Sequence, residues 1–372
     1  MDPATGELFD FDGYHVFKKY ESLVVIDDRT EGERPQHTDN KSLVPIDLSG
    51  KWLIKSNSEN SLTLDYCDYY FDGVLSEKHG YILNAMYRAI DIGKPVNIRC
   101  EYRVTFDYIP TTIYLVCETP EIFDIKVNGL AVDKTPCGYF RDKSFIKLDI
   151  SKLVKLGENI ITSEVYFCQS DKVYKNIEKS RHFESEKNKL TFDMEIEQIY
   201  LVGDFSVSTP GEFADLERRA ARYKGDFIIS EPCREIRLDN INRQGFPFFA
   251  GTIVLKKTFY AEERNMMIDF EKCGINVVKA KVNGKELAPM LYEPYTADIS
   301  EYIKIGENEI ELTLINNLRN LQGPFHLTEG ESYLVGPNSF YKENCIWYNG
   351  GNDGRWNDDY CFVEMSLTNR KK

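Results

Sequence analysis

The chain has 372 residues, 42% of them hydrophobic, which is enough to fill the cores of two or three domains. Lys and Arg number 46 against 60 Asp and Glu, and the net charge of -14 disfavours nucleic acid and anionic membrane surfaces as partners. No apolar run approaches the roughly 18 residues that a membrane-spanning helix needs.

The N-terminal residues 1–7 lack the basic start and apolar run of a secretory signal, and the nine cysteines show no C-x-x-C spacing. Several cysteines lie inside apolar runs, as Cys117 does in Tyr-Leu-Val-Cys. These features predict reduced thiols, no metal site and a cytoplasmic location.

Residues 1–45 differ in composition from the remainder of the chain. A strand is predicted over residues 21–26, and residues 27–40 are polar and rich in turn formers. We interpret this region as the tail of a preceding β domain or a linker.

From residue 46 onward the sequence predicts strands with little helix. Strands are predicted over residues 51–56, 61–71, 96–105, 112–118, 160–167, 190–207, 252–260 and 265–271. Helical periodicity is confined to residues 76–90 and, more weakly, 213–223, and residues 171–189 are predicted as a loop or short helix. Nothing alternates as βαβ, so the fold class is predicted to be all-β.

An internal repeat organises the chain. Three segments recur in the same order: Val127-Asn128-Gly129 as Val282-Asn283-Gly284, Asp149-Ile150-Ser151 as Asp298-Ile299-Ser300, and Gly157-Glu158-Asn159 as Gly306-Glu307-Asn308. Asn-Gly after alternating apolar residues predicts a strand that enters a tight hairpin turn, and Gly-Glu-Asn predicts a turn that begins another strand. The sequence therefore predicts two copies of one antiparallel β-sandwich, at residues 46–207 and 208–372.

The repeated motifs, the opening Leu48-Ser49-Gly50-Lys51-Trp52 and the C-terminal segments 319–326 and 356–363 resemble known sugar-binding domains. These are the galactose-binding-like jelly-roll domains of glycoside hydrolase family 2 and of α-L-rhamnosidase-like large bacterial proteins. The resemblance implies two tandem jelly-roll sandwiches and a carbohydrate partner, such as a plant or host glycan. It also implies a catalytic domain elsewhere in the parent protein, because catalysis in that family resides in a separate domain.

Catalytic signals are weak. Glycoside hydrolysis needs two carboxylates about 5–10 Å apart, and neighbours in a strand such as Asp358 and Asp359 point to opposite faces. Asp65, Asp68 and Asp72 form another acidic cluster. No catalytic residue and no cofactor is assigned, and a structural calcium ion is kept as an alternative.

The candidate ligand-binding residues gather near the C-terminus, where Gly and Asn predict loops. They combine stacking rings with hydrogen-bonding groups, and they are Arg319, His326, Trp347, Trp356 and Asp358. Packing is the favoured interpretation for Phe246, Phe248 and Phe249 beside Gln244, whereas Tyr139, Arg141 and Asp142 are kept as a further polar and aromatic set. Trp52 is expected in a core.

These observations leave three functions open. The first is a non-catalytic carbohydrate-binding or accessory region of a glycoside-hydrolase-like protein. The second is an architectural scaffold that packs on a catalytic domain and touches no sugar, and the third is a stand-alone glycosidase.

Overall fold

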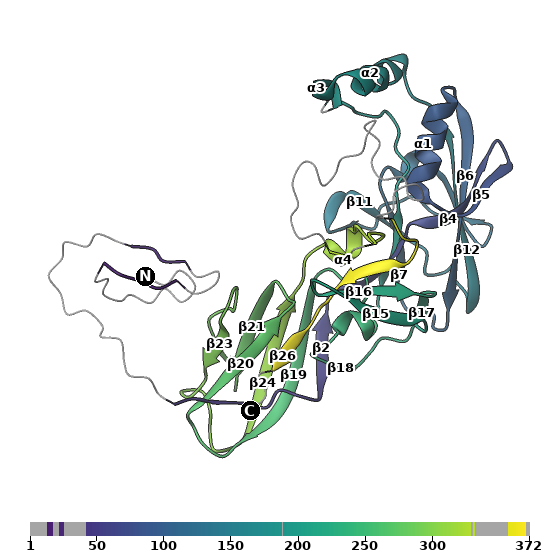
Figure 1. Cartoon of the computed structure of the whole chain (residues 1–372). Helices are drawn as coiled ribbons and strands as arrows, with labels where there is room; N and C mark the ends of the chain where they lie inside the picture. The colour runs from purple at the N-terminus through teal and green to yellow at the C-terminus, as the bar shows by residue number, and fades with distance from the viewer. Residues whose placement is uncertain are drawn as a thin grey trace.

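The computed structural model describes residues 13–17, 22–25, 42–187, 189–328, 330–331 and 356–369. Strands account for 45% of the chain and helices for 11%, so the all-β prediction is confirmed. The strand predicted over residues 21–26 is not formed at the described residues 22–25. Two large hydrophobic cores divide the strands into two lobes (Figure 1).

Two sheets surround the core of the first lobe. One has five strands in the order β10 (Tyr139–Phe140), β11 (Asp142–Asp149), β7 (Ile113–Cys117), β13 (Ile199–Gly203) and β3 (Asn60–Leu64). The other has eight, with the path β14 (Ser206–Ser208), β17 (Ile228–Ser230), β6 (Val96–Phe106), β12 (Gly157–Phe167), β8 (Asp124–Val127) and β9 (Leu130–Ala131). β4 (Tyr66–Phe71) pairs with β6 and with β5 (Val74–Tyr81).

The second lobe also has two sheets around one core. A six-stranded sheet runs β18 (Glu235–Arg237), β2 (Lys51–Asn57), β19 (Thr252–Ala261), β24 (Gly306–Ile315), β21 (Val277–Val282) and β22 (Lys285–Glu286). A four-stranded sheet runs β1 (Val44–Pro45), β20 (Met266–Cys273) and β23 (Tyr295–Asp298), with β26 (Leu367–Asn369) also on β20.

A fifth sheet, with three strands, corrects one prediction. β15 (Glu212–Leu216) and β16 (Ala220–Lys224) form a hairpin where a weak helix was predicted, and β25 (Tyr360–Val363) pairs with β16. Arg218 and Arg219 have φ of 60° and 57°, which ends any helical path between the strands. The spacing of the apolar residues in this segment fits both the period of a helix and the period of a strand. Pairing with the distant β25 favours the strand.

The helices are short. They are α1 (Ile82–Ile92), α2 (Asp171–His182), α3 (Glu184–Lys187) and α4 (Arg319–Gln322), with 3₁₀ turns at Pro120–Ile122 and Ile241–Arg243. α1 starts later than predicted, because the preceding residues form β5, and it ends where Gly93 adopts the left-handed conformation. Figure 1 shows α2 and α3 standing away from the sheets of the first lobe. Residues 190–198, predicted as strand, form none.

The repeated motifs occupy equivalent turns in the two lobes. Asn128 and Gly129 join β8 to β9 with φ of 52° and 81°, and Asn283 and Gly284 join β21 to β22 with φ of 50° and 81°. Such a pair of positive φ angles is the reason that Asn-Gly is used there.

The side-chain amides of the repeat make the same hydrogen bonds twice. Asn128 donates to Asn159 Oδ1 over 2.8 Å, and Asn283 donates to Asn308 Oδ1 over 2.8 Å. Each acceptor amide donates in turn to a backbone carbonyl four residues earlier, Lys155 or Lys304, at 2.7 Å. Asn159 and Asn308 are buried. The equivalence predicted from the sequence is therefore confirmed at these positions.

The lobes share chain segments. β2 precedes the strands of the first lobe in sequence, yet it lies between β18 and β19 of the second lobe. Trp52 on β2 is fully buried in the second core, as expected for a core residue. The chain thus begins its described strands in the second lobe, builds the first, and returns.

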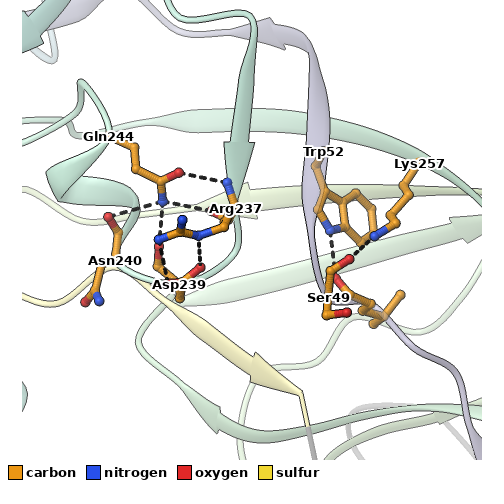
Figure 2. Close-up of polar contacts among 8 residues, drawn as sticks. Ser49, Trp52, Arg237, Asp239, Asn240, Gln244 and Lys257 are labelled. Atoms are coloured by element: carbon orange, nitrogen blue, oxygen red, sulfur yellow. Dashed lines mark hydrogen bonds and ion pairs between the residues drawn. The ribbon is translucent and has the colours of Figure 1, made fainter.

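Polar contacts fix residues 48–52, where the chain enters β2, and the nearby turn over residues 237–244. Figure 2 shows the Trp52 indole N–H pointing to the Leu48 carbonyl, 3.0 Å away, and the Lys257 ammonium donating to the Ser49 carbonyl. Nearby, Gln244 accepts from the backbone N–H of Arg237 and donates to the carbonyl of Asp239. These bonds satisfy backbone groups that a chain crossing between lobes would otherwise leave unpaired.

The buried amide network makes a stability prediction. Asn159→Ala should lower the free energy of unfolding by about 2 kcal/mol, because it removes the partner of the Lys155 backbone N–H and C=O and one acceptor of the Asn128 amide. Urea unfolding followed by tryptophan fluorescence measures this. Asn97→Ala, at an exposed position, is the matched control, and equal losses in the two variants would contradict the role of the network.

Candidate functional site

Three of the predicted ligand-binding residues meet at one place on the first lobe. His326, Trp356 and Asp358 lie with Tyr66 and Tyr81 in a set of touching rings and hydrogen bonds. Trp347 lies outside the described residues. We call the set of Asp65, Tyr66, Tyr81, His326, Trp356, Asp358 and Tyr360 the aromatic–carboxylate cluster.

A buried contact between a carboxylate and an imidazole forms the innermost part of the cluster. Asp65 lies between β3 and β4 and is fully buried, and its Oδ2 is 2.9 Å from His326 Nε2. The other ring nitrogen of His326 is 3.1 Å from the Asp359 carbonyl, which can only accept a hydrogen bond. Tyr360 donates to the second oxygen of Asp65.

Both ring nitrogens of His326 face oxygens that can accept a hydrogen bond, the Asp359 carbonyl and the Asp65 carboxylate. The buried carboxylate and the buried imidazole are thus each other's polar partner. Removing either partner would leave a buried group uncompensated.

The outer part of the cluster combines an indole with a carboxylate. The Trp356 ring is 4.8 Å from the rings of both Tyr81 and His326, measured between centroids. Asp358 Oδ1 accepts from the Trp356 indole N–H at 3.1 Å and from the Tyr66 hydroxyl at 3.0 Å. Trp356 is half-buried and Asp358 is exposed, so this part of the cluster meets solvent.

The phenols of the cluster are held protonated. Burial raises the pKa of Tyr66 far above its usual range, and the negative charges of Asp358 and Asp65 add to the effect. Burial likewise raises the pKa of Tyr81 and of Tyr360, each with a contribution from Asp65. The hydroxyls of Tyr66 and Tyr360 therefore donate to Asp358 and Asp65, respectively, across the neutral pH range.

Arg319, the remaining predicted residue, makes its contacts elsewhere. Its Nε donates to Glu331 Oε2 over 2.6 Å. Its two terminal guanidinium nitrogens are buried and meet no hydrogen-bond partner among the described residues. Burial raises the pKa of the Cys361 thiol, and the positive charge of Arg319 offsets part of that rise.

The other aromatic candidates are sorted by burial. Phe246, Phe248 and Phe249 are buried, which confirms that they pack rather than bind. The side chain of Tyr139 is 57% exposed. The carboxylate of Asp142 accepts hydrogen bonds from the backbone N–H and the hydroxyl of Ser144, in a local turn.

Sequence reasoning missed the parts that the first lobe contributes to the cluster. Asp65 was considered only as a member of an acidic group, and Tyr66 and Tyr81 were not singled out. The sequence carries only a partial signal: Asp65 falls between Leu64 and Tyr66 inside the predicted strand 61–71, and an acid that is buried needs a partner.

The structure offers no grouped metal ligands and no membrane span in the parts described. Over the described residues, no three His, Cys, Asp or Glu side chains are placed to hold a metal ion. No described helix is long and apolar enough to cross a membrane. The eight described cysteines are free thiols.

The comparisons with known proteins give distant likenesses. No protein-family model and no curated protein matches the sequence. Among solved structures, a rhamnosidase from Novosphingobium sp. PP1Y is similar at 15% identity and a TM-score of 0.22, over 71% of this chain and 21% of that one. An α-L-rhamnosidase from Streptomyces avermitilis has 9% identity and a TM-score of 0.23, over 72% and 25% of the two chains.

A β-glucuronidase from Ruminococcus gnavus is similar at 11% identity and a TM-score of 0.25, over 74% of this chain and 41% of that one. The chain therefore spans less than half the length of each of these proteins. Scores this low place no family name on the chain.

The buried phenols predict a loss of stability in alkali. Because the pKa of Tyr360 is raised in the folded protein, its contribution to stability is present below the unfolded value, about 10, and is lost as pH rises beyond it. The free energy of unfolding should fall between pH 9 and about pH 11, and the fall should be shallower in Tyr360→Phe. Tyr260→Phe, at an exposed tyrosine, is the control, and identical slopes in all three proteins would refute the assignment.

Proposed function

We propose that this chain is a non-catalytic carbohydrate-binding or accessory region of a glycoside-hydrolase-like protein. The observation that carries the proposal is the outer part of the aromatic–carboxylate cluster, where Trp356 and Tyr66 share the carboxylate of Asp358. An indole offers a flat apolar face to the C–H groups of a pyranose, and a carboxylate accepts from sugar hydroxyls.

The charge of the chain favours a neutral glycan. A net charge of -14 repels polyanionic sugars, whereas stacking and hydrogen bonding need no charge on the ligand. We propose a plant or host glycan as the ligand, the catalytic domain of the parent protein as the second partner, and the cytoplasm as the location, the last because the described cysteines are free thiols.

We further propose that each lobe is a galactose-binding-like jelly-roll sandwich, in tandem over residues 46–207 and 208–372. The duplicated Asn–Asn network supports a duplicated module. The division is amended at both lobes, because β2 is hydrogen-bonded in the sheet of the second lobe, whereas β17 pairs with β6 and β14 of the first. Residues 1–45 remain proposed as the tail of a preceding domain or a linker.

One observation favours the alternative of an architectural scaffold. Asp65 and His326 are buried, and with Tyr360 they attach the segment after β24 to the first lobe. These residues can serve the fold without touching a sugar. The two functions then differ in what the outer residues Trp356 and Asp358 do.

Glycan titration decides between the two. Binding of neutral methyl glycosides, followed by NMR, should show a dissociation constant near 1 mM, a roughly 4 kcal/mol interaction. Trp356→Ala should weaken binding about fivefold, since stacking on an indole contributes about 1 kcal/mol. Trp356→Phe keeps a ring and should retain most of the affinity.

The control is Tyr260→Ala, which removes an exposed ring of the second lobe and should leave binding unchanged. Absence of any titrating glycan, or equal binding in a folded Trp356→Ala protein, would favour the scaffold.

The non-catalytic assignment has its own test. Asp65 is buried with both oxygens in hydrogen bonds, so it is unavailable as the partner carboxylate that Asp358 would need for glycoside hydrolysis. A panel of nitrophenyl glycosides should therefore show no hydrolysis above background. Hydrolysis that persists through repurification and disappears in Asp358→Asn would establish a stand-alone glycosidase instead.

A further inference from the structure

A hollow lies in the first lobe, and its lining differs from the aromatic–carboxylate cluster. It has a volume of about 410 Å³ and lies at the opening between the two sheets. Strands β6, β7, β8 and β12 and the segment before β13 contribute its walls. None of the cluster residues lines it.

The floor of the hollow is apolar. Buried Tyr102, Leu115 and Ile125 reach it from the two sheets, so the hollow opens directly onto the first core. Phe123 and Phe192 are half-buried and line it as well. A floor of this kind accepts an apolar body and excludes water from its contacts.

The mouth of the hollow is acidic and lacks a basic lining residue. Its charged lining residues are Glu118, Glu121, Asp193, Glu195 and Glu197. Lys134 comes near but donates to the backbone carbonyl of Glu121, at 3.5 Å. Within the described ranges, no ion pair is formed by Glu195 or Glu197.

These carboxylates repel one another. Burial raises the pKa of Glu197, and the charges of Glu118 and then Glu195 raise it further. Burial also raises the pKa of Glu195, with Glu118 adding to it. A positive charge at the mouth would relieve this repulsion, and it would also be attracted to the faces of the aromatic rings beside it.

We propose that this hollow binds a small organic cation that carries an apolar body. The body occupies the floor between Phe123 and Phe192, and the ammonium lies at the mouth beside Glu195 and Glu197. The size of the hollow fits a ligand of one or two rings. This site is independent of the glycan-binding surface proposed above.

Tryptamine is a suitable probe, because it joins a protonated amine to a two-ring apolar body. We expect saturable binding in NMR titrations, with shifts at Phe123, Phe192 and residues 193–198. Tryptophol, which replaces the amine by a hydroxyl, should bind about tenfold more weakly, and indole-3-acetate should not bind.

Variants separate this site from general attraction to an acidic protein. The double variant Glu195→Gln with Glu197→Gln should weaken tryptamine binding about tenfold, and it should fold normally because each amide keeps the size and shape of the carboxylate it replaces. Glu307→Gln, at an exposed position of the second lobe, is the matched control and should bind like the unmodified chain.

Trp356→Ala should leave tryptamine binding unchanged, which keeps a failure of the glycan proposal distinct from a failure of this one. Equal affinity for tryptamine and tryptophol would overturn the proposal. Shifts scattered over the surface, or affinity unaltered in the double variant, would overturn it too.

Discussion

A carboxylate buried away from water constrains the rest of the first lobe. Asp65 has no exposure, and burying an unpaired carboxylate would cost far more than a folded domain can supply. Its oxygens therefore need His326 and the Tyr360 hydroxyl, which arrive from the far end of the chain. The partners of one acid thus fix the C-terminal segment against β4, and Trp356 and Asp358 take their places because that segment is fixed.

The need of buried polar groups for hydrogen-bond partners also connects the two lobes, here through the backbone. β2 enters the second lobe before the first lobe is built, and its N–H and C=O groups find partners on both β18 and β19. β25 then returns to pair with β16, whose Tyr223 packs in the first core. In Figure 1 the yellow strand that carries β25 lies against the teal β16, and β2 lies among the green strands of the other lobe. Neither lobe is completed by one continuous segment of the chain.

The sequence predicted what depends on local chemistry. Asn-Gly requires positive φ, and both copies adopt it at Asn128 and Asn283, with the buried Asn159 and Asn308 in matching positions. It did not predict what depends on distant partners. The hairpin over residues 212–224 has apolar spacing that suits a helix or a strand, and β25 decides between them. His326 could be named from composition, but Asp65, 261 positions away, could not be matched to it.

The two proposed surfaces use the acidity of the chain in opposite ways. In the aromatic–carboxylate cluster, each charge that faces inward is compensated: Asp65 has His326, and Asp358 receives two donors on one oxygen. A carboxylate whose charge is compensated can still accept directional hydrogen bonds, but it produces only a weak electrostatic field. Such carboxylates favour a neutral partner. At the hollow, Glu195 and Glu197 face Glu118 with no described cation paired to them, so the field there is uncompensated and selects for positive charge. The difference follows from topology, because the cluster joins residues of the first lobe to His326 and residues 356–360 from a distant part of the sequence, whereas the acidic mouth is built from residues of the first lobe alone.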